Sequence, residues 1–344
     1  MRIGILTGGG DAPGLNAAIR AVGRPAVAAG HTIVGIHNGW AGLVGDGDWT
    51  ELTRRDLGGI LPIGGTMLGS SRTNPMKMEG GLDRVQENLR RASLDALVAI
   101  GGDDTLSVAA WLAEHGAPVV GVPKTMDNDL SVTEYCIGFD TAVSIVAEAV
   151  DRLHTTATSH HRVMVCEVMG RDTGWVAVMG GLAGGADMIV IPEFAVSMDE
   201  VVEHTHRRRS AGSGFSIIVV SEGVEIDGSG GTDDPAAQRD AFGHVQLSRR
   251  GVGERLASII EERTGFETRA TVLGHTQRGG SPSAYDRIWA THVGYGAWQL
   301  VARGDFGLMP VVQCGRIEVA PIRDVVAEQR RVPRELYDLA TVFF

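Results

Sequence analysis

The sequence predicts an α/β protein with parallel sheets, divided into two domains. Short apolar, β-branched runs alternate with helical patterns, an order typical of parallel strands covered by helices on both faces. A length of 344 residues with 43% hydrophobic content is ordinary for a globular protein and is enough for two cores. The strand-like runs are 2–7, 31–37, 95–100, 117–123, 162–169, 187–192, 215–223 and 270–275.

The elements follow one another in a regular order. The first run leads through a glycine-rich turn into a helical pattern at 14–30, and a second such pattern at 81–93 precedes the third run. A long, well-marked stretch separates the fourth and fifth runs, which places a domain boundary near residue 138. A helical pattern at 140–159 follows it. The segment 223–250 is polar and rich in Gly and Asp, and its first half is expected to form an exposed excursion.

Composition and charge limit the class of function. The net charge of −11 argues against binding to nucleic acid or a membrane surface, and no run reaches the ~18 apolar residues of a membrane span. The first residues lack the features of a signal peptide, so we expect a cytoplasmic protein. Cys136, Cys166 and Cys314 have no metal-like spacing, and two of them lie in or beside apolar runs, which favours buried free thiols. Only Lys77 and Lys124 among the 31 basic residues are lysines.

Ligands of open parallel α/β sheets bind beyond the carboxyl ends of the strands, so residues that follow each run are candidates for the site. The turn 8–14 places three glycines between strand and helix, where backbone N–H groups can hold a phosphate; a plain tight connection is the alternative. The turn 101–105 has a glycine pair followed by Asp103 and Asp104. The Gly-Lys-Ser/Thr ending of a P-loop is absent, as is a clean dinucleotide-binding fingerprint.

The stretch 122–129, Val-Pro-Lys-Thr-Met-Asp-Asn-Asp, is the most informative. Asp127 and Asp129 stand two apart after an apolar run, with Thr125 before them. One carboxylate can take a proton from a sugar hydroxyl while another helps to hold Mg²⁺, although Asp and Asn also favour turns.

Further polar residues follow the later runs. Arg171 and Glu222, and then His275 and Arg278, come at strand ends. Arginine binds phosphate oxygens in a bidentate manner, and glutamate accepts hydrogen bonds from sugar hydroxyls. Arg72 lies in a polar loop that, taken alone, is better interpreted as a surface turn.

Six stretches, in order, resemble the 6-phosphofructokinase family, and the similarity runs from residue 3 to about residue 300. They are 8–20 (GGGDAPGLNAAIR), 64–72 (GGTMLGSSR), 101–105 (GGDDT), 123–129 (PKTMDND), 160–171 (HHRVMVCEVMGR) and 270–282 (ATVLGHTQRGGSP). The family phosphorylates the C1 hydroxyl of fructose 6-phosphate, with ATP or, in some lineages, pyrophosphate as donor. The resemblance implies two doubly wound, mostly parallel-sheet α/β domains with the active site in the cleft. The donor-binding domain would be 1–138 plus about 277–327, and the fructose-6-phosphate-binding domain 139–276 plus about 328–344.

The resemblance also implies a role for each matching residue. Asp127 would be the general base, with Thr125 beside it, and Arg171 would stabilise charge on the moving phosphoryl group. Asp103 and Asp129 would serve Mg²⁺. The residues implied to bind the phosphoryl donor are Gly10, Arg72, Gly102, Asp104, Thr105 and Lys124. Those implied to bind fructose 6-phosphate are Thr125, Asp127, Met169, Gly170, Arg171, Glu222, His275 and Arg278, with Arg162 and Arg269 reaching in from a neighbouring subunit.

Two residues depart from the ATP-using members of the family, which have Gly at the positions of Asp104 and Lys124; the pyrophosphate-dependent members have Asp and Lys, as here. A carboxylate at position 104 fills the space of a nucleoside and repels its α-phosphate. Lys124 adds a compact positive charge beside the β-phosphoryl group and is expected to contribute to catalysis. We therefore predict a Mg²⁺-dependent enzyme that transfers a phosphoryl group reversibly from pyrophosphate to fructose 6-phosphate. An ATP-dependent enzyme and a non-catalytic sugar-phosphate-binding regulator are the alternatives.

A site shared between subunits implies a homo-oligomer, either a dimer or, more often in the family, a tetramer. Arg20, Arg24 and Arg54 match part of the family's effector site. However, His154 replaces a usual arginine and 210–215 lacks the usual lysines, which predicts weak or absent effector control.

Overall fold

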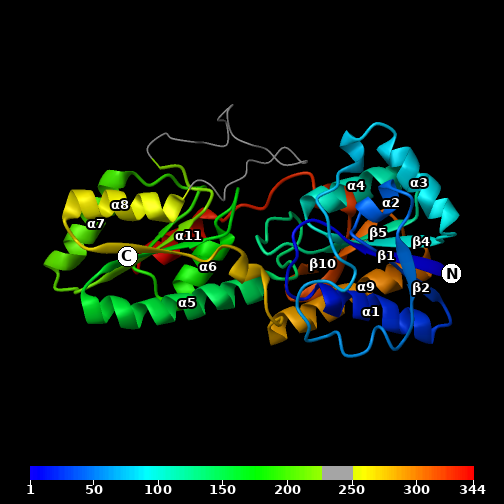
Figure 1. The fold of residues 1–344 in the computed structure, drawn as a ribbon, viewed down its shortest axis with the longest axis horizontal. Coiled ribbons are helices and arrows are strands. Elements are labelled where there is room, and N and C mark those ends of the chain that lie inside the picture. Colours follow the sequence, from blue (N-terminus) through cyan, green and yellow to red (C-terminus); the bar gives the residue numbers. More distant parts are fainter. Residues whose placement is uncertain (227–250) are drawn as a thin grey trace. The chain divides into compact units, whose positions relative to one another are not determined.

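The computed structural model describes residues 1–226 and 251–344, which belong to two compact units. Unit 1 consists of Met1–Asp140 and Arg278–Arg330, and unit 2 of Thr141–Gln277 and Arg331–Phe344. Each unit is therefore assembled from segments far apart in the sequence (Figure 1). Most of the segment expected to be an exposed excursion, residues 227–250, lies outside the described residues.

Unit 1 is built on a five-stranded sheet with the order β3-β2-β1-β4-β5. Its strands are β1 (Arg2–Thr7), β2 (Thr32–Ile36), β3 (Trp49–Leu52), β4 (Ala96–Gly101) and β5 (Val119–Pro123). β1 pairs in parallel with β2 and β4, and β4 with β5, whereas β3 is antiparallel at the edge. The chain runs outward from β1 in one direction and then returns to add β4 and β5 on the other side. The carboxyl ends of β1 and β4 thus form the switch point at which such sheets bind ligands.

Helices cover both faces of this sheet. Figure 1 shows α1 (Leu15–Ala28) and α9 (Ala284–Arg303) on one face, and α2 (Ala41–Val44), α3 (Gly81–Arg91) and α4 (Asp103–Glu114) on the other. Leu6, Leu97 and Ala99 pack against Leu106 and Ala109 of α4 in one buried cluster. A hairpin of β10 (Leu308–Gln313) and β11 (Arg316–Pro321), followed by α10 (Ile322–Val325), completes the unit.

Unit 2 has a four-stranded, wholly parallel sheet with the order β7-β8-β6-β9. Its strands are β6 (Val163–Val168), β7 (Met188–Val190), β8 (Ser216–Ser221) and β9 (Thr268–Val272). Its helices are α5 (Phe139–His160), α6 (Trp175–Gly184), α7 (Met198–Ser210), α8 (Val252–Thr264) and α11 (Arg334–Thr341). Val165 and Ile218 of the sheet pack with Val201 of α7 and Leu256 of α8 in one buried cluster. Ser197 begins α7 with a reciprocal capping box to Glu200.

The predicted α/β class with mostly parallel sheets is confirmed, and each predicted run overlaps a strand. The last run is only partly correct, because β9 ends at Val272 and a 3-10 helix follows over Gly274–Arg278. The strands β3, β10 and β11 were not predicted. Of the three thiols, Cys136 and Cys166 are buried, while Cys314 is exposed.

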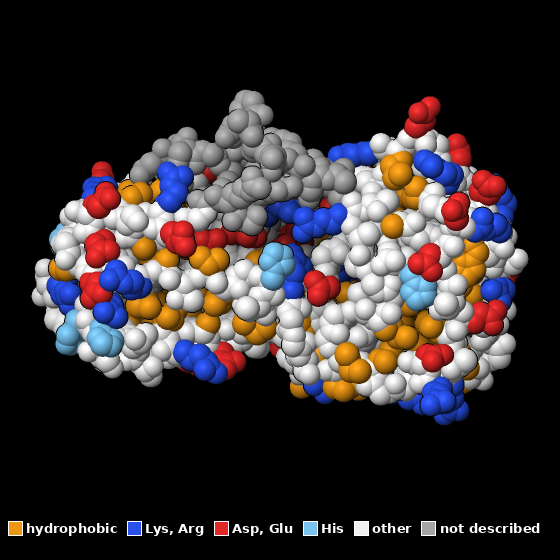
Figure 2. Space-filling model, in the orientation of Figure 1, with side chains coloured by type: hydrophobic (Ala, Val, Ile, Leu, Met, Phe, Trp, Pro, Cys, Tyr) orange, Lys and Arg blue, Asp and Glu red, His pale blue; other side chains and the backbone are white. Residues whose placement is uncertain are grey.

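The charged side chains of the surface are of both signs. Figure 2 shows acidic and basic side chains interspersed over the visible, described face of each unit. Within the two described ranges, no helix is both long and apolar enough to span a bilayer.

Candidate active site

In unit 1, the turns that follow β1, β4 and β5 come together at the carboxyl edge of the sheet. The backbone N–H of Gly8 donates to the carbonyl of Ile100 over 3.0 Å, and that of Lys124 to the carbonyl of Gly101 over 2.9 Å. A Cβ atom at Gly8 would stand 2.4 Å from Oγ1 of Thr105. Glycine is therefore needed for the close approach between the first turn and the start of α4.

Lys124 is a buried cation at the centre of these turns. Its side chain is 3% exposed, and Nζ donates to the carbonyl oxygens of Gly8 over 3.2 Å and Gly10 over 2.6 Å. Burial, and secondarily the charge of Arg278, lower the pKa of the ammonium group to about 8. Keeping the ammonium group of Lys124 charged therefore has a considerable desolvation cost. Such a cost is expected for a cation that binds an anionic ligand.

Arg278 lies against the glycine-rich turn. Its Nη1 atom donates to the carbonyl of Asp11 over 3.0 Å, and a Cβ atom at Gly10 would stand only 2.6 Å from Nη1. The loop with Arg72 also contacts this turn, because the N–H of Gly9 donates to the carbonyl of Ser71 over 3.1 Å. The side chain of Arg72 itself is exposed.

Three carboxylates lie near one another beside Lys124. The pKa of Asp129 is raised to about 7, first by burial and then by the negative charges of Asp127 and Asp103. Thr125 Oγ1 accepts the N–H of Asp127 over 3.1 Å. Asp103 and Asp104 occupy the first turn of α4, where the helix dipole favours negative charge.

The carboxylates suit a divalent cation that is shared with a substrate. Over the described ranges, no group of three or more His, Cys, Asp or Glu side chains forms a complete metal site. Mg²⁺ usually takes one or two carboxylates and completes its shell with water and substrate phosphates. Mutual repulsion among Asp103, Asp127 and Asp129 is what such a cation would relieve, so the residues present fit this kind of ion.

In unit 2, a pocket of about 350 Å³ opens at the carboxyl ends of β6 and β9. It brings together Met169, Glu222 and His275, three of the residues predicted to bind the sugar phosphate. The backbone is tied closely here, since the N–H of Glu222 donates to the carbonyl of Val168 over 2.9 Å. Gly170 has a φ of 137°, which residues other than glycine rarely adopt.

Arg171 follows Gly170 directly. Its Nε atom is buried and has no hydrogen-bond partner among residues 1–226 and 251–344. Burying a donor in this state costs free energy, and an anionic ligand would recover it.

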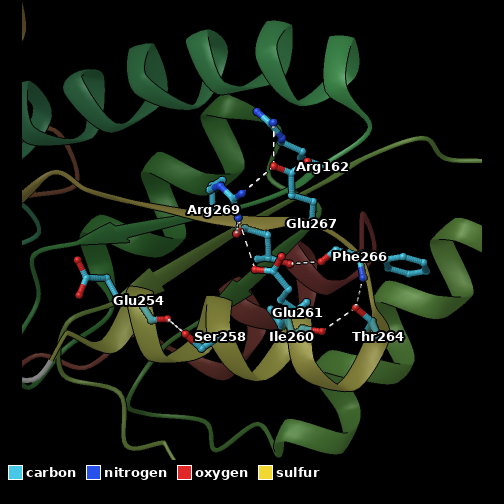
Figure 3. A network of polar contacts seen from close by, with 10 residues as sticks. Arg162, Glu254, Ser258, Ile260, Glu261, Thr264, Phe266, Glu267 and Arg269 are labelled. Carbon is cyan, nitrogen blue, oxygen red and sulfur yellow. Dashed lines mark hydrogen bonds and ion pairs between the residues drawn. The ribbon is translucent and has the colours of Figure 1, made fainter.

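Arg162 and Arg269 lie at the opposite end of the same sheet from this pocket. Arg162 directly precedes β6, so seven residues of chain, about 23 Å if extended, separate it from Met169. Figure 3 shows both guanidinium groups turned toward Glu267, at 2.8 Å for Arg162 and 2.7 Å for Arg269. These two arginines therefore do not reach the pocket of their own chain.

Sequence reasoning missed Glu167 and Glu254, which also line the pocket. Glu167 lies within β6 and accepts the N–H of Gly253, at the start of α8, over 2.6 Å. Burial is the main reason that its pKa is raised. Its position inside an apolar run could have indicated it, because a carboxylate in a buried strand needs a hydrogen-bond donor such as the N–H of Gly253.

Glycine-rich turns, a buried cation and clustered carboxylates at the ends of parallel strands characterise enzymes that handle phosphate groups. The phosphofructokinase family model matches residues 2–301. A pyrophosphate–fructose 6-phosphate 1-phosphotransferase from Amycolatopsis methanolica is 53% identical over 100% of both chains. An ATP-dependent 6-phosphofructokinase 3 from Streptomyces coelicolor is 45% identical over 98% of both.

The fold agrees with these matches. The crystal structure of Pichia pastoris phosphofructokinase in the T-state superposes with a TM-score of 0.81 at 32% identity. The alignment covers 99% of this chain and 36% of the longer Pichia pastoris chain. The chain belongs to the phosphofructokinase family.

Proposed function

We propose that this protein transfers a phosphoryl group from pyrophosphate to the C1 hydroxyl of fructose 6-phosphate, giving fructose 1,6-bisphosphate and phosphate. Membership of the family supports the reaction class. The pyrophosphate-using name of the 53% identical relative supports the donor. Because pyrophosphate and the product are of comparable energy, the reaction is expected to run in both directions, in glycolysis and gluconeogenesis.

The donor assignment depends on two side chains, those of Lys124 and Asp104. The ammonium group of Lys124 is buried between the turn that follows β1 and the turn that follows β5, where it suits a small, highly charged donor. Asp104 is in the first turn of α4, the place where a nucleotide's α-phosphate would need room and positive potential. The two side chains together favour pyrophosphate over ATP.

In this proposal unit 1 binds the donor and begins the chemistry. Gly10, Gly102 and Thr105 would present the turns to the phosphates, and Arg72 would contact them from its exposed loop. Asp127 would accept the proton of the C1 hydroxyl as general base, with Thr125 Oγ1 fixing its backbone over 3.1 Å.

In this proposal the metal ion is bound by carboxylates of unit 1. We assign Asp103 and Asp129 to Mg²⁺, which when bound would neutralise the charge that develops on the donor during transfer. The raised pKa of Asp129 supports this assignment, since a carboxylate beside other carboxylates gains most from a cation.

Unit 2 would bind the sugar phosphate. Met169, Glu222 and His275 line its pocket, and Gly170 shapes the turn beside it. Arg171 would stabilise charge on the moving phosphoryl group through its buried guanidinium. Arg278 in unit 1 is assigned to the same substrate. Arg162 and Arg269 would serve the pocket of a neighbouring subunit, which requires a homo-oligomer.

The test compares pyrophosphate and ATP as donors, in the wild type and in the Asp104→Gly/Lys124→Gly double variant. We expect strong wild-type preference for pyrophosphate, and loss of pyrophosphate use in the double variant. Robust wild-type turnover with ATP alone would refute the donor assignment and support an ATP-dependent enzyme. Binding of fructose 6-phosphate without turnover with either donor would instead indicate a sugar-phosphate-binding regulator.

A further inference from the structure

Burial alternates along the loop that follows β5. Met126, Asn128 and Leu130 are buried, whereas Asp127 and Asp129 are partly exposed. The buried side chains anchor the loop in unit 1, and the carboxylates between them keep part of their surface exposed. Asn128, which lies between the two carboxylates, is the polar member of the buried set.

Asn128 uses both polar atoms of its side chain to hold the loop. It is 2% exposed and has a φ of 51°, in the left-handed region that Asn tolerates better than most residues. Its Oδ1 atom accepts the N–H of Cys136 over 2.9 Å, and its Nδ2 atom donates to the carbonyl of Glu134 over 3.2 Å. The loop that carries the two carboxylates is thus hydrogen-bonded, through Asn128, to residues six and eight positions further along the chain.

Arg330 holds the same loop from another part of the sequence. Its backbone N–H donates to the carbonyl of Asp129 over 2.7 Å. Its Nη1 atom donates to the carbonyl of Glu134 over 3.0 Å, the same carbonyl that Asn128 contacts. Leu130 and Gln329 form an antiparallel bridge beside these contacts. Arg330 is also the last residue of unit 1 before the chain enters unit 2.

We propose that Asn128 and Arg330 are positioning residues that fix the carboxylates of Asp127 and Asp129 for phosphoryl transfer. This inference rests on the proposed function, which assigns a base and a metal ligand to those carboxylates. General-base catalysis depends on geometry, and displacement of a reacting group by 1 Å can cost about 100-fold in rate. The side-chain hydrogen bonds of both residues are made to backbone atoms of Asn128, Glu134 and Cys136, so their removal loosens the loop that carries the carboxylates without removing a substrate contact.

The first variant is Asn128→Gly, which tolerates the positive φ but lacks the amide. We expect kcat to fall about 10- to 100-fold, while KM for fructose 6-phosphate and for the donor changes less than about threefold. The Mg²⁺ concentration that gives half-maximal rate should rise, because the metal carboxylate is displaced. Ser93→Gly is the matched control: Ser93 is exposed, has a φ of 52°, and lies just after α3. It should keep full activity.

Arg330→Met and Arg330→Lys test the second contact. Both keep the backbone hydrogen bond to Asp129, and the lysine can still reach a carbonyl oxygen. We expect Arg330→Met to lose at least 10-fold in kcat and Arg330→Lys to recover part of that loss. If Asn128→Gly does not fold, the two Arg330 variants decide the matter.

Two results would overturn the inference. The first is kcat within twofold of wild type in both Asn128→Gly and Arg330→Met. The second is a loss spread equally over kcat and both KM values together with a lower thermal midpoint, which would indicate general loosening. If the wild type does not use pyrophosphate, the proposed donor fails but the inference does not, and the same variants are then compared with ATP as donor.

Discussion

Replacement of Lys124 by Met should abolish most donor binding and yet leave stability nearly unchanged. Burial lowers the pKa of this lysine from 10.5 to about 8. A pKa change of one corresponds to about 1.4 kcal/mol, so the charged side chain costs the folded state about 3.5 kcal/mol at neutral pH. Methionine removes this cost but forfeits the hydrogen bonds to the carbonyls of Gly8 and Gly10, which contribute about 1–1.5 kcal/mol each. The net change in the free energy of unfolding should stay within about 2 kcal/mol.

The sign of the pH dependence follows from the direction of the shift. The folded pKa lies below the unfolded one, so the unfolded chain binds more protons between pH 8 and 10.5. Through this group, wild-type stability therefore rises with pH across that window, and Lys124→Met lacks the rise. Urea unfolding of both proteins at pH 7.5 and at a pH near 10 measures the difference.

Function should respond far more strongly than stability. A pKa of about 8 leaves roughly nine in ten Lys124 side chains charged at pH 7. A charge-assisted contact is worth about 1.5–3 kcal/mol, so KM for pyrophosphate should rise about 10- to 100-fold in Lys124→Met. Lys77→Met is the control, because Lys77 is the only other lysine in the chain and is exposed. An unchanged KM, or a stability loss above about 4 kcal/mol, would refute the argument that this buried cation serves the donor.

Two further predictions concern other parts of the molecule. His204 is 2% exposed, and burial together with the charges of Arg207 and Arg208 lowers its pKa to about 4. Unfolding should therefore become easier by about 3 kcal/mol as pH falls from 6.5 to 4, and His204→Gln should remove that part of the acid sensitivity in denaturant titrations. If the site is shared between subunits as proposed, Arg162→Ala should damage a neighbour's pocket and His275→Ala the chain's own pocket. Mixing the two variants should restore activity that each lacks, and no recovery after subunit exchange would contradict a site shared between subunits.

Local sequence patterns were sufficient for the parallel strands and for the turns that follow them. Buried strands such as β4 and β5 are continuous apolar runs, and the residues of the unit 1 site come directly after them. The edge strand β3 escaped detection because it is only four residues long, Trp-Thr-Glu-Leu, with two exposed side chains. Alternation over so short a stretch cannot be distinguished from a loop.

Residues that hold the site in place are much harder to find than residues that belong to it. Lys124 was conspicuous because the chain contains so few lysines, and Asp127 because it follows an apolar run. Asn128 looked like an ordinary turn residue, and Arg330 stands about 200 residues away from the loop that it contacts. Its importance depends on the chain returning to unit 1 after unit 2, which no local pattern encodes. A prediction of positioning residues therefore needs the backbone contacts themselves, whereas the base and the cation of a site can be found from residue type and from their position directly after a strand.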